Sequence, residues 1–244
     1  EELSKISMLL LGILIYLTCS IRFNRGRDRE ATALKISLTR DLVNFIDKQH
    51  VDDGYAQITK EPTIFSLTDY RLPLYLYIIA ELYQANIYTE KLDRIIEGMI
   101  PIIQRSFPAL YSNRIYLLVA LYHLTHVKCV PAWDAHIKAL EQNIDFERMF
   151  KSEFRDRSVN FKHGLSGLLF ILRITSPTNR IPRKEELCKQ IAQKIEHSTF
   201  FHDLASEKTE PGIMLGICGI GLSLLLNRMG DKSIDMNLKP EFRK

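Results

Sequence analysis

The sequence has few signals for β-structure and lacks the motifs of several common kinds of site. Alternating apolar and polar residues, the pattern of strands, are almost absent. The four cysteines include no CxxC pair, so we expect buried thiols in a reducing compartment instead of a disulfide framework. There is no GxxxxGK[ST] phosphate loop, and the net charge of +4 includes no basic run. We therefore expect no nucleotide site and no nucleic-acid partner.

The sequence also lacks an apolar run long enough to cross a membrane. Its most apolar stretch near the start, Met8–Ile21, has 14 residues, whereas a spanning helix needs about 20. Glu1 and Glu2 stand where a signal peptide would carry basic residues. We predict a buried core helix here, no membrane span and a cytoplasmic location. The basic segment that follows the run leaves room for a membrane-associated partner.

Helical patterns fill most of the 244 residues, and two kinds alternate. One kind is apolar on all sides, which is typical of helices enclosed by others. The other is amphipathic, which is typical of helices with one face in water. The apolar segments are Leu3–Phe23, Asp69–Gln84, Asn113–Val127, Gly164–Ile174 and Gly212–Met229, and the amphipathic segments are Glu30–Gln49, Thr89–Ser106, Pro131–Asn143 and Lys184–His197.

The alternation has the character of an internal repeat. Alignment of the five apolar segments makes Gly12, Pro73, Arg114, Gly167 and Gly219 equivalent, at intervals of 61, 41, 53 and 52 residues. Repeated helical hairpins of this length, with buried inner and half-buried outer helices, predict an all-α fold of the (α/α) toroid or solenoid type. We expect one domain over residues 1–230 and a tail over 231–244.

Glycines mark the beginning of the last two apolar segments. Gly216, Gly219 and Gly221 stand in the final one, and Gly164 and Gly167 repeat the spacing of the first two. Because glycine is a poor helix former, its presence here predicts close approach of another backbone or of a ligand.

These two stretches resemble a known family. The runs HGLSG at 163–167 and LGICGIGL at 215–222 are similar to the last two repeats of the lanthionine synthetase C-like proteins, the peptide cyclases of lanthipeptide biosynthesis. The resemblance implies a seven-repeat (α/α) toroid, of which this chain would hold about the last five repeats. It also implies a zinc ion, held by two cysteines and a histidine, that activates a substrate thiol. The thiolate adds to a dehydrated Ser or Thr and closes a thioether ring.

The sequence departs from the family pattern at the expected zinc site. The two cysteine positions hold Ala109 and Lys162, and only His163 matches a ligand; the position of a further family histidine is Asp69. One ligand is too few for catalytic zinc, so we expect no metal or other cofactor. The resemblance then predicts an accessory module that binds a precursor or modified peptide. The residues proposed to bind it are Gly164, Gly167, Gly216, Gly219 and Tyr111.

Other interpretations stay open at this point. The chain could be an active thioether cyclase in which Lys162, His163 and Asp69 replace zinc by acid–base chemistry. Equally, His163 could be an ordinary helix-start histidine, and Asp69 with Lys162 a structural ion pair. A different all-α toroid, such as a glycosidase-like barrel, would need paired carboxylates, for which only Asp52 and Asp53 are candidates.

Overall fold

A computed structural model describes residues 29–30, 33–38, 40–41, 71–84, 86, 89–154, 159–162, 164–174, 180–198, 212 and 216–229. Within these ranges the chain forms helices and no strand, which confirms the all-α prediction. The elements are α4 (Arg71–Gln84), α5 (Thr89–Arg105), α6 (Tyr111–Val127), the 3₁₀ turn η1 (Pro131–Trp133), α7 (Asp134–Gln142), α8 (Phe146–Ser152), α9 (Leu165–Ile174), α10 (Lys184–Glu196) and α12 (Ile217–Met229).

Burial follows the two sequence patterns. Helix α6 buries every residue from Ile115 to Leu124, as its all-round apolar sequence predicts. Helix α5 buries one face only, at the helical spacing of Leu92, Ile95, Ile96, Met99 and Ile103. We therefore call the apolar helices the inner helices and the amphipathic ones the outer helices, although the apolar helix α12 leaves one face exposed.

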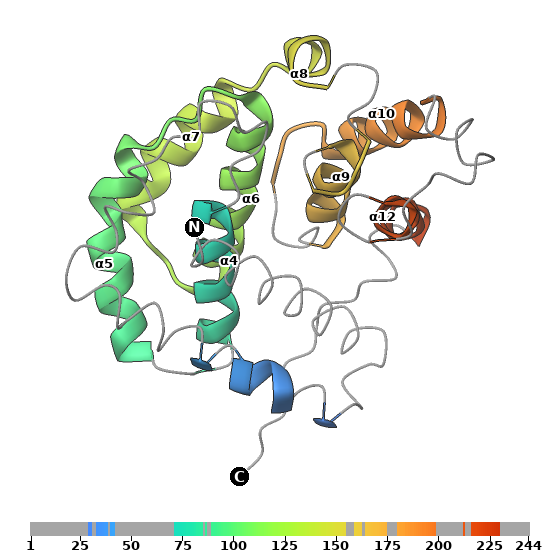
Figure 1. Cartoon of the computed structure of the whole chain (residues 1–244). Coiled ribbons are helices and arrows are strands. Elements are labelled where there is room, and N and C mark those ends of the chain that lie inside the picture. The colour runs from blue at the N-terminus through green and yellow to red at the C-terminus, as the bar shows by residue number, and fades with distance from the viewer. Residues whose placement is uncertain are drawn as a thin grey trace, which may run out of the picture.

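The inner helices α4 and α6 lie side by side and run in the same direction. The Tyr77 ring in the middle of α4 stacks on His123 of α6, with ring centroids 4.6 Å apart. At the ends of the two helices, the Lys128 ammonium lies 5.4 Å from the centre of the Tyr83 ring and 2.5 Å from Asp93 of α5. Contacts at matching levels show the parallel arrangement (Figure 1).

Helices α9 and α12 form a second parallel pair. The Ser223 hydroxyl of α12 donates to the Ser166 carbonyl of α9 at 2.7 Å. One to two turns further on, Arg173 Nε donates to Asn227 Oδ1 at 2.9 Å. Small side chains at Gly219, Ser223 and Ser166 let the two backbones approach closely, since all three residues are buried.

The inner helices follow one another in chain order, and the outer helices pack on them. Helix α6 contacts α9, which joins the two pairs, while α5 packs on α4, α7 on α6 and α10 on α9 (Figure 1). One hydrophobic core extends from Leu76 of α4 to Ile220 of α12. Closure of this series into a ring stays a prediction, because the segments 3–23 and most of 30–49 lie outside the described residues. The boundaries of the single domain stay a prediction for the same reason.

Two local expectations need correction. Cys129 and Cys218 are exposed thiols, whereas Cys188 is buried as expected. His123, whose ring stacks on Tyr77, is buried inside α6 and only 2% exposed. The outer segment Pro131–Asn143 divides into η1 and α7, because Trp133 is drawn into the core and fixes a tight turn before the helix.

The described helices include none that is long and apolar enough to cross a bilayer. The apolar run Met8–Ile21 lies outside the described residues.

Candidate functional site

The candidate site is the end of the molecule where the inner helices begin. Within each parallel pair the helices begin at the same end, and Gly167 at the start of α9 lies against the Tyr116 hydroxyl from the second turn of α6, which brings the starts of the two pairs together. The aligned positions Pro73, Arg114, Gly167 and Gly219 all fall in the first turn or just after it. We call this the amino end of the inner helices.

At this end, Gly167 lies against the chain's own backbone. A Cβ atom built on Gly167 would stand 2.1 Å from the Phe161 carbonyl oxygen and 3.3 Å from the Tyr116 hydroxyl. No side chain fits there without movement of the 159–162 turn. The sequence therefore predicted the close approach correctly, and the neighbour is backbone. Gly164, Gly216 and Gly219 are buried too, whereas a Cβ on Gly221 would meet nothing within 4 Å.

The start of α6 is held by a buried carboxylate that comes from the end of α8. Glu153 is 5% exposed, and its two oxygens accept hydrogen bonds from the backbone N–H of Tyr111 at 2.6 Å and of Ser112 at 2.9 Å. The Ser112 hydroxyl donates a third bond, also 2.6 Å long. A carboxylate is stabilised here because the first turn of a helix presents unpaired N–H groups and the positive end of the helix dipole.

Glu153 did not emerge from the sequence. The one available signal was indirect: the residue before α6 is Leu110, which has no side-chain acceptor, and its side chain makes no capping bond. A helix that starts without a cap needs an acceptor from elsewhere. The sequence does not say which of the many carboxylates supplies it.

An exposed aromatic ring lies beside this capped helix start. The Arg114 guanidinium lies 4.6 Å from the ring centre of Phe107 and 4.8 Å from that of Tyr111, which are cation–π distances. Phe107 is 46% exposed, and Tyr111 is half-buried. We call Phe107, Tyr111 and Arg114 the aromatic–arginine cluster.

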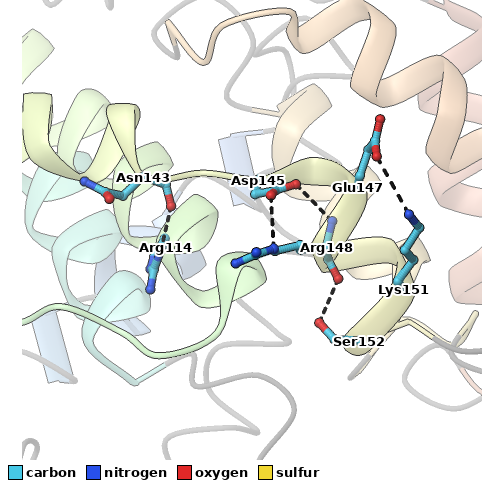
Figure 2. Close-up of polar contacts among 7 residues, drawn as sticks. All are labelled: Arg114, Asn143, Asp145, Glu147, Arg148, Lys151 and Ser152. Carbon is cyan, nitrogen blue, oxygen red and sulfur yellow. Dashed lines mark hydrogen bonds and ion pairs between the residues drawn. The ribbon is translucent and has the colours of Figure 1, made fainter.

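Arg114 also fixes the backbone around the cluster. Its Nε donates to the Pro108 carbonyl at 2.7 Å and its Nη2 to the Ala109 carbonyl at 3.3 Å. Its Nη1 donates to the Asn143 carbonyl at 2.6 Å, the bond drawn in Figure 2. The guanidinium thus joins the turn before α6 to the end of α7. The Arg114 side chain therefore stabilises the backbone of this region, while the ring of Phe107 is exposed to water.

The charged side chains of α8 are paired with one another. Asp145 caps the helix by accepting from the Arg148 N–H at 3.0 Å, and its second oxygen lies 3.5 Å from Arg148 Nε (Figure 2). Lys151 Nζ lies 3.8 Å from Glu147. Exposed pairs of this kind contribute little to stability, but they leave the amino end without a strong charge of either sign on α8.

A histidine lies behind the cluster. The His136 ring contacts the edge of Phe107 at 6.4 Å between centroids, and its Nε2 atom is buried without a hydrogen-bond partner among the described residues. Burial lowers the pKa of His136, while a hydrogen bond to the Ser106 backbone opposes the shift. The neutral imidazole is therefore favoured at this position.

At the far end of α6, Tyr122 donates a hydrogen bond to Glu141 of α7. Burial raises the pKa of Tyr122 well above its usual range, and the bond to Glu141 adds to the shift. The phenol stays protonated and joins the inner helix to its outer partner.

The structure describes only one of the three predicted catalytic residues. Lys162 lies half-buried in the turn before α9, whereas Asp69 and His163 lie outside the described residues. Within the part of the chain that is described, no three His, Cys, Asp or Glu side chains are grouped to hold a metal ion. The predicted peptide-binding residue Tyr111 belongs to the aromatic–arginine cluster.

Comparisons of the chain with protein-family models, curated proteins and solved structures found no significant match. The resemblance to the lanthionine synthetase C-like proteins therefore depends on the two glycine motifs and on the order of the helices.

Proposed function

We propose that this protein binds a peptide at the amino end of the inner helices, as an accessory module of peptide modification. The observation that carries the proposal is the aromatic–arginine cluster. An exposed aromatic ring backed by a fixed guanidinium offers apolar contact area at little cost in side-chain entropy, and Tyr and Arg are enriched where proteins bind partners. The cluster lies in the repeat that precedes the HGLSG motif.

The residues at the two positions that hold zinc-binding cysteines in the resembled family support a function without zinc. Ala109 lies in the turn before α6, and Lys162 lies in the turn before α9. Neither a methyl group nor an ammonium group can ligate zinc. The two positions thus belong to the amino ends of neighbouring helices, but their side chains suit contact with a peptide better than activation of a thiol.

Peptide binding can be measured directly with a fluorescent peptide that contains cysteine and dehydroalanine. We expect a Kd in the micromolar range by fluorescence anisotropy, and at least tenfold weaker binding for Phe107→Ala, because the exposed ring would supply the main contact area. Leu34→Ala is the matched control, since Leu34 is 51% exposed and lies outside the cluster. Absence of binding at 100-fold higher peptide concentration, or an equal loss in both variants, would disprove the proposal.

The same peptide distinguishes binding from the alternative, catalysis. A cyclase that uses Lys162, His163 and Asp69 would convert the peptide to a thioether without change in mass, and cysteine alkylation would fail on the product. Under our proposal the thiol stays free to react with the alkylating reagent. Turnover that is abolished by His163→Ala would replace the accessory role with an enzymatic one.

A further inference from the structure

The Arg114 guanidinium keeps part of its hydrogen-bonding capacity and all of its charge. An arginine side chain offers five N–H donors, and here three of them donate to the backbone carbonyls of Pro108, Ala109 and Asn143. These acceptors are neutral, and none of the ion pairs among the described residues includes Arg114. One N–H group on each terminal nitrogen therefore has no acceptor within the described part of the chain.

Two carboxylates of this region are engaged with other groups. Glu153 is buried and accepts three hydrogen bonds at the start of α6. Asp145 accepts from the Arg148 N–H and pairs with the Arg148 guanidinium (Figure 2). Neither carboxylate compensates the charge of Arg114 beside the exposed ring of Phe107.

We propose that the aromatic–arginine cluster selects peptides in which a carboxylate stands beside an apolar side chain. The carboxylate accepts hydrogen bonds from the two remaining N–H groups of Arg114, and the apolar side chain packs on the exposed ring of Phe107. A carboxylate has the charge and the planar shape that a guanidinium binds best. This inference rests on the proposed peptide binding and adds the chemical class of the ligand.

The geometry of the cluster limits the spacing of the two groups in the ligand. The guanidinium carbon of Arg114 lies 4.6 Å from the centre of the Phe107 ring, and neighbouring residues of a peptide have Cα atoms about 3.8 Å apart. The carboxylate and the apolar side chain therefore belong to the same residue or to residues close together in the sequence. An aspartate next to a leucine meets this condition, and so does a leucine whose own α-carboxylate ends the peptide.

Arg114 is held in position before a ligand arrives. Its guanidinium lies against the rings of Phe107 and Tyr111 and is fixed by three hydrogen bonds. A side chain held in this way loses little conformational entropy when it binds a partner. Arg148, whose side chain is 76% exposed, would lose more, which favours Arg114 as the group that binds the carboxylate.

Matched peptides test the selection on the unchanged protein. The peptide of the anisotropy experiment is made with an internal leucine–aspartate or leucine–asparagine pair, and with a terminal leucine as the acid or the amide. We expect the acid of at least one pair to bind about fivefold tighter than its amide, and this preference to shrink at high salt. The pair that shows it identifies a side chain or a chain terminus as the source of the carboxylate.

The same measurements separate this inference from the proposed peptide binding. Equal Kd values for acid and amide in both pairs would overturn the selection and leave the peptide binding intact. If none of the peptides bound, both would be disproved.

Substitution of single arginines locates the carboxylate. In Arg114→Gln the difference between acid and amide should disappear, whereas the matched control Arg148→Gln should keep it. Arg105, two residues before Phe107, is exposed and also lacks an ion pair among the described residues. A preference that survived in Arg114→Gln would overturn the proposal, and its loss in Arg105→Gln would assign the carboxylate to that arginine.

Photo-cross-linking of the unchanged protein keeps the test decisive if Arg114→Gln does not fold. A benzophenone side chain replaces the leucine beside the carboxylate, and peptide mapping identifies the labelled residues. We expect label within residues 105–114, suppressed by an excess of the unlabelled acid but not by the same concentration of the amide. Label confined to other segments, or equal suppression by acid and amide, would overturn the proposal.

Discussion

The first turns of α6 and α9 are stabilised by different kinds of contact. Both helices are inner helices, both begin at the same end of the molecule, and neither starts with a capping residue that a sequence pattern would identify. At α6 the free N–H groups are satisfied by Glu153, which lies 41 and 42 positions away along the chain. At α9 the chain packs on itself, with Gly167 against the Phe161 carbonyl and the Ser166 hydroxyl donating to the Val159 carbonyl.

The difference shows what each start depends on. The α6 start needs a tertiary contact, so it is complete only when α8 has reached its place. The α9 start needs a small residue and a local turn, both of which are encoded within nine residues. We therefore expect substitutions at the start of α6 to destabilise the protein by removing charge and hydrogen bonds. Substitutions at the start of α9 should destabilise it by steric overlap.

Replacement of Glu153 should have the largest effect. Glu153→Ala removes a carboxylate that accepts three hydrogen bonds, two of them from backbone N–H groups at the positive end of the α6 dipole. Hydrogen bonds to charged groups contribute about 1.5–3 kcal/mol each. We expect the free energy of unfolding, measured with urea, to fall by about 4 kcal/mol.

Two variants separate the charge from the contact at this site. Glu153→Gln keeps one acceptor oxygen and should lose about half as much stability. Glu147→Ala, on the same short helix but 87% exposed at its side chain, should change stability by less than about 0.5 kcal/mol. If Glu147→Ala were as harmful as Glu153→Ala, the cap at α6 would not be the cause.

The α9 start should respond next most strongly. In Gly167→Ala the new methyl group would stand 2.1 Å from a backbone oxygen, so the 159–162 turn has to move. Overpacking of this kind costs about 1–3 kcal/mol. Urea unfolding would measure the loss, and hydrogen exchange should show faster opening at the start of α9 than at the start of α6.

Gly212→Ala is the control for the change in residue type. A Cβ on Gly212 meets nothing within 4 Å, and its φ lies outside the range that favours glycine. This variant should be close to neutral. Equal destabilisation by Gly212→Ala and Gly167→Ala would show that steric overlap with the Phe161 carbonyl does not explain the effect at α9.

The sequence predicted the helices well because hydrophobic period is a local property. The observed α4, α6, α9 and α10 begin and end within about two residues of the predicted ends. Helix α5 extends through Pro101, a residue that usually ends a helix. The inner and outer assignment of the described helices followed from the same patterns, since a helix that is apolar on all sides has to be enclosed.

The site was predictable only in part. Glycine reports a local need for space, so Gly167 could be found, whereas Glu153 looks like any other acidic residue in a charged segment. The exposure of Cys218 was also missed, because an apolar sequence shows that a helix can be buried but not that a neighbour covers each face. Both failures concern contacts between distant parts of the chain, which the hydrophobic periodicity of a single sequence does not reveal.

A smaller effect is expected from Arg114, which joins the turn before α6 to the end of α7. Arg114→Lys keeps the charge but cannot reach the Pro108, Ala109 and Asn143 carbonyls together. We expect a loss of about 1–2 kcal/mol in the free energy of unfolding. Arg148→Lys, an exposed member of a local ion pair, should be neutral by the same measurement.

The smallest of the four expected effects is a loss of stability at acid pH that acts through His136, beside the turn before α6, and not through the start of α9. Burial holds the pKa of His136 below its ordinary value of 6.5, so the unfolded chain takes up a proton more readily than the folded one. The stability from the neutral ring is therefore complete above the unfolded pKa, and it is lost as the pH falls through 6.5 towards the folded pKa. Urea unfolding at pH 7.5 and 5.5 should show a smaller loss for His136→Gln than for the unchanged protein, because glutamine does not titrate. The control is the exposed His197: we expect His197→Gln to leave the difference in the free energy of unfolding between pH 7.5 and 5.5 unchanged. If His197→Gln reduced that difference as much as His136→Gln does, the acid sensitivity would not come from the region beside the turn before α6.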